Sequence, residues 1–245
     1  MKQFFADWWR ALLNLIFPTC RCLYCGQEGV LDEGGLCSSC REKLKAEEDF
    51  SLCALCPTFI PIGDKYCPNC WEGKRHWFDA GIAVFPYHGA LRDMIHDFKY
   101  RGRKKWAKPL GLLMVETLQK DPRFHAIDMV VPVPLHVKRK AMRGYNQSEL
   151  LAKEIGRSLG LPVAVDILCR IKDTPSQTGL RRKGRQMNLA DAFQIIDSSS
   201  LRGKNILLVD DIYTTGATVE TCSRILKTEG VKSVFVVTCA AGKCY

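Results

Sequence analysis

Thirteen consecutive residues combine two adjacent carboxylates with a run of small and hydroxyl side chains. Residues 206–209 are apolar and typical of a buried parallel strand. Asp210 and Asp211 follow, and we expect them to end the strand at its carboxyl edge, where open α/β sheets bind ligands. The next loop precedes a helical pattern and consists of Thr214, Thr215, Gly216, Ala217 and Thr218. Backbone N–H groups, hydroxyls and a helix N-terminus suit a phosphate, whereas the carboxylates suit ribose hydroxyls or a metal ion beside it.

This order of residues resembles the phosphoribosyl pyrophosphate (PRPP) loop of the type I phosphoribosyltransferases. The resemblance implies that Asp210 and Asp211 contact the ribose 2- and 3-hydroxyls of Mg²⁺-bound PRPP and that the threonine-rich loop holds the 5-phosphate. The plain alternative is two solvated aspartates followed by an ordinary helix cap, which needs only one capping residue. Hypoxanthine-type members carry a basic aspartate where this chain has Thr214, so hypoxanthine-like chemistry is disfavoured. Orotate- and adenine-type members also lack that aspartate.

A second candidate site follows the apolar segment 127–134. Arg143 lies after a basic turn and could bind a pyrophosphate through two parallel hydrogen bonds. Asn146, Gln147 and Ser148 open the next predicted helix, where capping is the simpler role. Residues 174–189 are polar and basic and predict a long loop. In phosphoribosyltransferases a lid at this place excludes water from the reacting sugar, and the alternative is a solvated basic loop.

Eight cysteines form four C-x-x-C pairs between residues 20 and 70. Two such pairs, about 10–20 residues apart, complete a tetrahedral site for zinc. Neighbouring pairs are the shorter route, although interleaved pairing stays open, and Cys20 is surplus. Four protein ligands leave no open position, so we expect two structural zinc ions rather than catalytic ones. The candidate ligands are Cys22, Cys25, Cys37, Cys40, Cys53, Cys56, Cys67 and Cys70.

Composition divides the chain of 245 residues into unlike parts. Residues 1–78 hold nine Lys/Arg and ten Asp/Glu, a net charge of −1, whereas residues 79–245 hold 27 and 16, a net charge of +11. We predict an amphipathic helix in 1–19, a double zinc ribbon in 20–78 and an α/β domain in 79–245. The helix either packs on the rest of the chain or docks on a membrane or partner. No transmembrane segment or signal peptide is expected, which favours a reducing, cytoplasmic compartment.

Three basic stretches without acidic residues suggest nucleic-acid binding. Phosphates would lie on the cations, and single-stranded bases would stack on interleaved rings. Pyrophosphate binding and ordinary solvation are the alternatives. The candidates are Lys99, Arg101, Arg103, Lys104, Lys105, Trp106, Arg181, Arg182, Lys183 and Arg185. Lys138, Arg139 and Lys140, with Arg143, form the remaining stretch.

Strand patterns alternate with helical ones beyond residue 78, which predicts an open, mainly parallel sheet flanked by helices. The expected strands are 81–87, 127–134, 163–171, 192–196, 206–211 and 233–239. The expected helices include 107–118 and 148–159. Together these elements predict a type I phosphoribosyltransferase fold with a small N-terminal cysteine-rich domain.

The cysteine module, the Arg143-Gly-Tyr-Asn-Gln segment, the basic loop and the 206–218 stretch together resemble the ComF family (ComFC/GntX-like) of competence-associated proteins. The resemblance implies a cytoplasmic DNA-uptake accessory that binds single-stranded DNA and a ComFA-like helicase during natural transformation, and that can be recruited to the inner face of the membrane. PRPP or a nucleotide-like ligand would fill the pocket. The alternative is an active phosphoribosyltransferase with an unknown base or amine acceptor.

Overall fold

The computed structural model describes residues 20–45, 50–173 and 191–244. Contacts divide the chain into two compact units, Met1–Ala46 and Glu47–Tyr245, which we describe separately. The amphipathic helix predicted in 1–19 and the predicted lid lie outside the described residues. The domain boundary expected at residue 78 stays a prediction. In the described ranges no helix has the length and hydrophobicity needed to cross a bilayer.

The first unit is a small ribbon built around four cysteines. Two isolated antiparallel bridges, Arg21 with Glu28 and Leu31 with Cys37, shape its turns. One short helix, α2 (Ser38–Lys45), follows. Since residues 20–45 contain little regular structure, the cysteine cluster is the main feature of this part of the unit.

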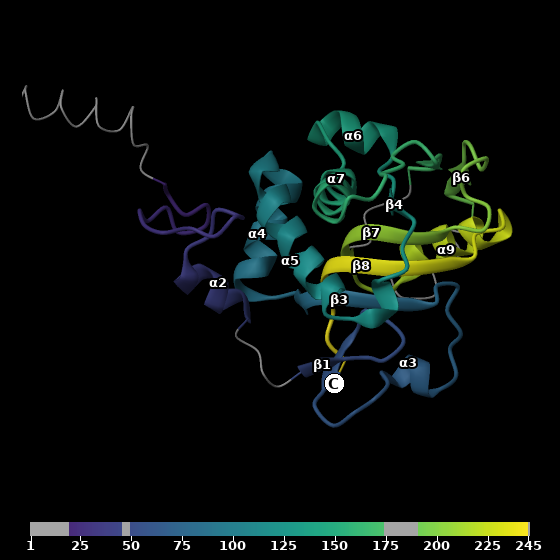
Figure 1. The fold of residues 1–245 in the computed structure, drawn as a ribbon, viewed down its shortest axis with the longest axis horizontal. Helices are drawn as coiled ribbons and strands as arrows, with labels where there is room; N and C mark the ends of the chain where they lie inside the picture. Colours follow the sequence, from purple (N-terminus) through teal and green to yellow (C-terminus); the bar gives the residue numbers. More distant parts are fainter. Residues whose placement is uncertain (1–19, 46–49, 174–190, 245) are drawn as a thin grey trace, which may run out of the picture. The chain divides into compact units, whose positions relative to one another are not determined.

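A four-stranded parallel sheet forms the centre of the second unit (Figure 1). The strands lie in the order β3 (Ala80–Pro86), β8 (Ser233–Ala241), β7 (Asn205–Tyr213) and β4 (Met129–Pro132). Their residues are apolar and mostly buried, as expected for parallel strands covered on both faces. The predicted open parallel sheet is confirmed.

Strand β7 is longer than the sequence pattern predicts. The sequence pattern predicts that the acidic pair ends the strand at residue 211, but pairing with β8 continues to Tyr213, opposite Ala241. The apolar and β-branched residues of β8 reach just as far, so the backbone of the acidic pair still finds hydrogen-bond partners. Asp210 and Asp211 therefore lie inside a strand, on a rigid element rather than in a loop.

Helices cover the sheet on either side. Helices α5 (Ala107–Gln119) and α7 (Gln147–Leu159) pack on one another and on the strands, next to α4 (Gly89–Tyr100) (Figure 1). Helix α9 (Ala217–Thr228) packs on β7 and β8, where Ile206 and Leu208 share a buried cluster with Cys222. Further short helices among the described residues include η1 (Lys104–Trp106), η2 (Pro122–Phe124) and α6 (Val137–Arg143).

Two small antiparallel pairs accompany the sheet. Strands β5 (Leu168–Arg170) and β6 (Phe193–Ile195) pair with each other, so the strand expected over 163–171 is largely wrong. Only Val163 bridges Val130 of the main sheet, and the chain then turns away. The other pair, β1 (Phe50–Leu52) and β2 (Phe59–Pro61), forms the second ribbon with α3 (Pro68–Trp71).

Candidate functional site

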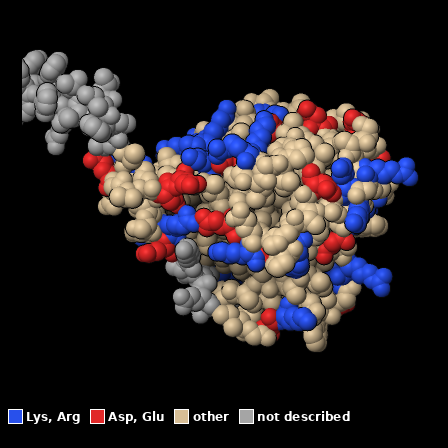
Figure 2. All heavy atoms as spheres, in the orientation of Figure 1, with Lys and Arg blue, Asp and Glu red and all other residues tan. Residues whose placement is uncertain are grey.

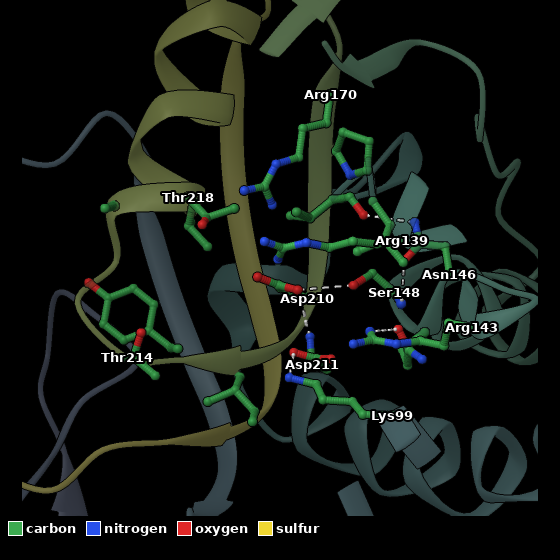
Figure 3. Close-up of a pocket in the computed structure, with 18 of the residues that line it drawn as sticks. Lys99, Arg139, Arg143, Asn146, Ser148, Arg170, Asp210, Asp211, Thr214 and Thr218 are labelled. Atoms are coloured by element: carbon green, nitrogen blue, oxygen red, sulfur yellow. Dashed lines mark hydrogen bonds and ion pairs between the residues drawn. The ribbon is translucent and has the colours of Figure 1, made fainter. Parts of the chain in front are cut away.

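A pocket of about 320 Å³ opens at the carboxyl ends of β4 and β7. It lies where the connections of neighbouring parallel strands diverge, which is the usual ligand position in open α/β sheets. Side chains from α4, α6, α7, β5, β7 and the loop before α9 line it (Figure 3). The structure thereby brings together the acidic pair, the threonine loop and Arg143, as the sequence predicted.

Two cationic or polar neighbours hold the acidic pair. Lys99 Nζ lies 2.8 Å from Asp211 Oδ1, and both side chains are largely buried. Ser148 Oγ donates a hydrogen bond of 2.9 Å to Asp210 Oδ1, and the Asp211 N–H donates to the same oxygen. Both carboxylates line the pocket, and Asp210 is the less buried residue of the two.

Burial and mutual repulsion control the charge of this pair. Burial, followed by the charge of Asp211, raises the pKa of Asp210 to about 7, against the opposing effect of Lys99. Burial alone would lower the pKa of Lys99, but the Asp211 carboxylate outweighs it and raises that pKa. Lys99 is thus a charged group of the pocket, whereas the sequence placed it in a nucleic-acid track.

The loop of residues 214–218 comprises the turn after β7 and the first two residues of α9. Gly216 has a φ of +76°, a left-handed conformation that favours glycine, and it caps α9. A Cβ atom there would lie 2.4 Å from the Tyr213 hydroxyl, so the tyrosine ring closes over the loop. Thr214, Gly216, Ala217 and Thr218 line the pocket, where the helix N-terminus can meet an anion.

Three arginine side chains face the acidic pair across the pocket (Figure 3). Arg143 donates a 2.6 Å hydrogen bond to Gln147 Oε1 and lies over the Tyr100 ring, 5.2 Å from its centroid. Arg139 Nε lies 3.3 Å from Asp173 Oδ1. Burial, followed by the charge of Arg139, lowers the pKa of Arg170. Guanidinium groups gathered in this way favour a polyanionic ligand.

Sequence reasoning missed Arg170 as a pocket residue. It lies at the end of β5, in a segment that carries no motif, and only the turn of the chain away from the main sheet brings it inward. The alternative capping role is confirmed for Asn146, whose side chain accepts from the Ser148 N–H at 3.1 Å. Gln147 instead orients Arg143 and donates to the Phe98 carbonyl at 3.2 Å.

The first basic stretch divides between the pocket and the surface. Trp106 is 1% exposed, so the prediction that its ring stacks on bases is wrong: the ring fills the core beside α5. Tyr100 is 66% exposed and offers the aromatic surface instead. The exposed cations are Arg101, Arg103, Lys104 and Lys105. Figure 2 shows basic side chains gathered over the ends of α4 and α6. Arg181, Arg182, Lys183 and Arg185 lie outside the described residues.

The cysteines form two separate tetrads, each within one unit. Cys22, Cys25, Cys37 and Cys40 make the first, and Cys53, Cys56, Cys67 and Cys70 the second. Neighbouring pairs therefore combine, and Cys20 is outside both groups. Sulfurs bound to one tetrahedral zinc ion at about 2.3 Å lie about 3.8 Å apart. The Cys25–Cys37 and Cys56–Cys67 sulfurs are 3.8 and 3.7 Å apart, so both tetrads fit zinc.

Family comparisons agree with this arrangement. A double zinc ribbon domain profile matches residues 12–70, and a phosphoribosyl transferase domain profile matches residues 146–245. The sheet, the loop and the tetrads thus define a type I phosphoribosyltransferase-like protein that carries a double zinc ribbon.

Full-length relatives narrow this class. The chain is 30% identical over 220 residues to "Competence protein F" of Haemophilus influenzae, which covers 88% of this chain and 94% of that protein. It is 30% identical over 231 residues to "Competence protein ComFC" of Streptococcus pneumoniae, covering 87% and 96%. "DNA utilization protein YhgH" of Escherichia coli is 29% identical over 218 residues, covering 88% and 94%. The chain belongs to the ComF family of competence-associated proteins.

Solved structures match only part of the molecule. The allosteric regulatory enzyme of purine biosynthesis is 18% identical with a TM-score of 0.38, covering 54% of this chain and 26% of that one. An APRTase from Giardia lamblia is 15% identical with a TM-score of 0.37, covering 52% and 65%. The chain spans less than two thirds of either protein.

Proposed function

We propose that this protein is a DNA-uptake accessory of natural transformation that binds Mg²⁺-PRPP in its pocket and single-stranded DNA on its basic surface. Family membership supports the cellular role, since two relatives carry competence in their names. The observation that carries the ligand proposal is the pocket itself, in which an acidic pair, a threonine loop at a helix N-terminus and three arginines converge.

Each part of the pocket suits a different part of PRPP. Asp210 and Asp211 would accept hydrogen bonds from the ribose hydroxyls, and residues 214–218 would donate to the 5-phosphate. Arg143 would bind the pyrophosphate, for which Gln147 orients its guanidinium. Mg²⁺ would neutralise the phosphate oxygens. The volume of about 320 Å³ is within the usual range for small-molecule sites.

Calorimetry with Mg²⁺-PRPP tests this proposal. We expect saturable binding by the wild type and none by the Asp210→Ala/Asp211→Ala variant. Asp191→Ala/Asp197→Ala, at two carboxylates outside the residues lining the pocket, is the matched control and should bind normally. A wild type that does not bind PRPP would refute the proposal.

The basic surface supports the DNA proposal. Arg101 and Arg103 are exposed and form ion pairs with Asp97, which holds both guanidinium groups near the end of α4. Tyr100 lies beside them with its ring accessible. Cations that follow a backbone, together with a stacking ring, are the ordinary features of single-strand binding.

A salt titration of DNA affinity tests the basic surface. Each phosphate contact that is lost reduces the slope of log K against log salt by about 0.7 for a single strand. We therefore expect Arg101→Gln/Arg103→Gln to weaken binding of a single-stranded oligonucleotide and to reduce the slope by about 1.4. Lys227→Gln/Lys232→Gln, which changes one cation in the last turn of α9 and one just before β8, is the control of equal charge. Equal affinity and slope in the first variant and the wild type would exclude this surface.

The further parts of the proposal rest on the geometry of the cysteines for zinc, on composition for the domain bounds and on family resemblance for the helicase and the membrane. We propose that two structural zinc ions occupy the tetrads, with a helicase as partner and the inner face of the membrane as the place of action. The domains would be the helix 1–19, the double ribbon 20–78 and the transferase-like domain 79–245.

Active phosphoribosyl transfer is the second candidate function. Arg139 and Arg170 favour it, because two further cations beside the acidic pair could stabilise a departing pyrophosphate. An acceptor nitrogen would form a bond to ribose C1 as the bond from C1 to pyrophosphate breaks. Pyrophosphate release from PRPP in the presence of candidate bases and amines tests this, and binding without any release would leave the accessory role alone.

A further inference from the structure

The second cysteine tetrad lies directly against the phosphate loop. Its four cysteines share a buried cluster with Tyr213, which precedes the loop, and with Ala217, which belongs to it. A cavity of about 200 Å³ between them is lined by Cys67, Cys70, Thr214 and Thr215. Because Tyr213 and Thr214 line both this cavity and the main pocket, the ribbon forms the back wall of the loop.

One histidine joins the tetrad to the helix that follows the loop. His76 Nε2 lies 3.2 Å from Cys70 Sγ, and His76 Nδ1 is hydrogen-bonded to Glu220 Oε1. The imidazole is 6% exposed and stacks on Phe78 with 4.5 Å between ring centroids. A ring packed in this way has one orientation. A displacement of Cys70 would therefore displace His76 and, with it, Glu220.

Glu220 in turn fixes the first turn of α9. Its Oε2 accepts from the Trp77 N–H at 3.0 Å, and Lys74 Nζ lies 3.2 Å from its Oε1. The Glu220 N–H donates to the Gly216 carbonyl at 2.8 Å, which closes the turn that begins at the phosphate loop. Three residues of the segment that follows the tetrad, Lys74, His76 and Trp77, thus converge on one carboxylate.

We propose that His76 and Glu220 are positioning residues through which zinc at the second tetrad holds the phosphate loop in its binding shape. In metal sites, groups that hydrogen-bond to a ligand orient it and are oriented by it. Here His76 is hydrogen-bonded to Glu220, which lies in the first turn of α9, beside the loop that would bind the phosphate. The role of the loop as a PRPP site rests on the proposed function, but the coupling between tetrad and loop does not.

Hydrogen exchange of the loop tests the coupling without any ligand. A zinc-selective chelator should be added to the full-length zinc-loaded protein, and deuterium uptake followed in residues 213–220. We expect faster uptake there after loss of the second zinc. Cys40→Ser, which damages the first tetrad in the other unit, should leave that uptake unchanged. Unchanged uptake in 213–220 after removal of both ions would overturn the proposal.

Point variants separate coupling from folding, since loss of a buried cysteine could unfold the unit. His76→Gln cannot bridge both neighbours, and Glu220→Gln removes the charge that gathers His76 and Lys74. Both should retain two zinc ions, exchange faster in 213–220 and bind Mg²⁺-PRPP about 3- to 10-fold more weakly. His125→Gln and Glu154→Gln are the matched controls, at positions outside both cavities. Wild-type exchange in both test variants would contradict the proposal.

Linkage provides the reciprocal measurement. If zinc orders the loop for PRPP, PRPP must strengthen zinc binding at the second tetrad by the same factor. The equilibrium affinity for one of the two zinc ions, measured by competition with the chelator, should then rise when PRPP is bound. Identical zinc affinities with and without bound PRPP would refute the coupling, whereas a wild type that binds no PRPP but shows zinc-dependent exchange would refute only the proposed function.

Discussion

Asp210 is the residue whose protonation the pocket controls most directly. Its pKa of about 7 follows from burial first and from the charge of Asp211 second. A carboxylate that accepts from ribose hydroxyls must be ionised, so binding below pH 7 has to expel a proton. The affinity for Mg²⁺-PRPP should therefore fall by up to about tenfold per pH unit below pH 7. Calorimetry between pH 5.5 and 8.5 measures this, and a flat profile would show that Asp210 is already ionised.

The protonation of Asp210 also affects the stability of the fold, which favours the protonated form, whereas ligand binding favours the ionised form. The folded state binds a proton at Asp210 up to about pH 7, whereas the unfolded chain releases it near the usual pKa of 3.8. The contribution of this group to the free energy of unfolding is therefore full below pH 4 and declines as pH rises to 7. Asp210→Asn should remove that decline in urea denaturation curves. A decline of equal slope in the variant would assign it to other groups.

Lys99 distinguishes a pocket cation from a surface cation. Its ammonium group lies 2.8 Å from Asp211, and its charge opposes the rise in the Asp210 pKa. We expect Lys99→Met to weaken PRPP binding and to shift its pH profile to higher pH, with little effect on DNA affinity. Lys105→Met removes an exposed charge from the same stretch. This variant should weaken DNA binding and have little effect on PRPP binding. Equal losses in both assays for both variants would contradict this division.

At the level of elements, the turn into α9 depends on Gly216. An alanine there would combine a strained φ of +76° with a Cβ contact of 2.4 Å to the Tyr213 hydroxyl. Gly160 ends α7 with a φ of +67° and open space around it, so Gly160→Ala reports backbone strain alone. We expect Gly160→Ala to cost about 1 kcal/mol and Gly216→Ala about 1–3 kcal/mol more, because a ring must move. Chemical denaturation of both variants measures the difference in the free energy of unfolding. Equal losses would show that the Tyr213 ring can move away without a loss of stability.

The sequence predicts the presence of strands better than the residues at which they end. Apolar runs such as 206–209 and 233–239 predict the parallel strands correctly, because burial on both faces requires continuous hydrophobicity. The extension of β7 beyond Asp211 to Tyr213 was missed, since backbone pairing with β8 outweighs the poor strand preference of the two aspartates before it. The turn of 163–171 away from the sheet was missed for the same reason: pairing between β5 and β6 is decided by tertiary contacts.

The sequence predicts site residues that are consecutive in the chain better than those brought together by the fold. Asp210, Asp211 and 214–218 were predicted because consecutive residues share one pocket wall. Arg170, Lys99 and His76 come from segments far away in sequence, and no local pattern assigns them to this pocket or its surroundings. Trp106 illustrates the converse, because a ring between lysines suggests exposure until the packing of η1 is known.

For the whole molecule, pocket and basic surface make separable contributions to transformation. If both are used, Asp210→Ala/Asp211→Ala and Arg101→Gln/Arg103→Gln should each lower transformation frequency, but only the second should lower DNA affinity. Normal transformation with the pocket variant would mean that PRPP binding is dispensable for this role. The measurement requires equal protein levels, which immunoblotting establishes.

The bridge between the second ribbon and the end of β8 has a consequence for the order of assembly. Phe59 donates to the Gly242 carbonyl and accepts from the Cys244 N–H, partners 183 (242 − 59) and 185 (244 − 59) positions away. At about 5–20 residues per second, a ribosome adds that length in about 10–40 s. The second tetrad spans only residues 53–70 and can acquire its ion long before its partners exist. A zinc-bound second ribbon would then fold first, and the last strand and the phosphate loop would pack on it after they are synthesised. The zinc concentration during synthesis would therefore determine the fraction of molecules with a correctly folded pocket.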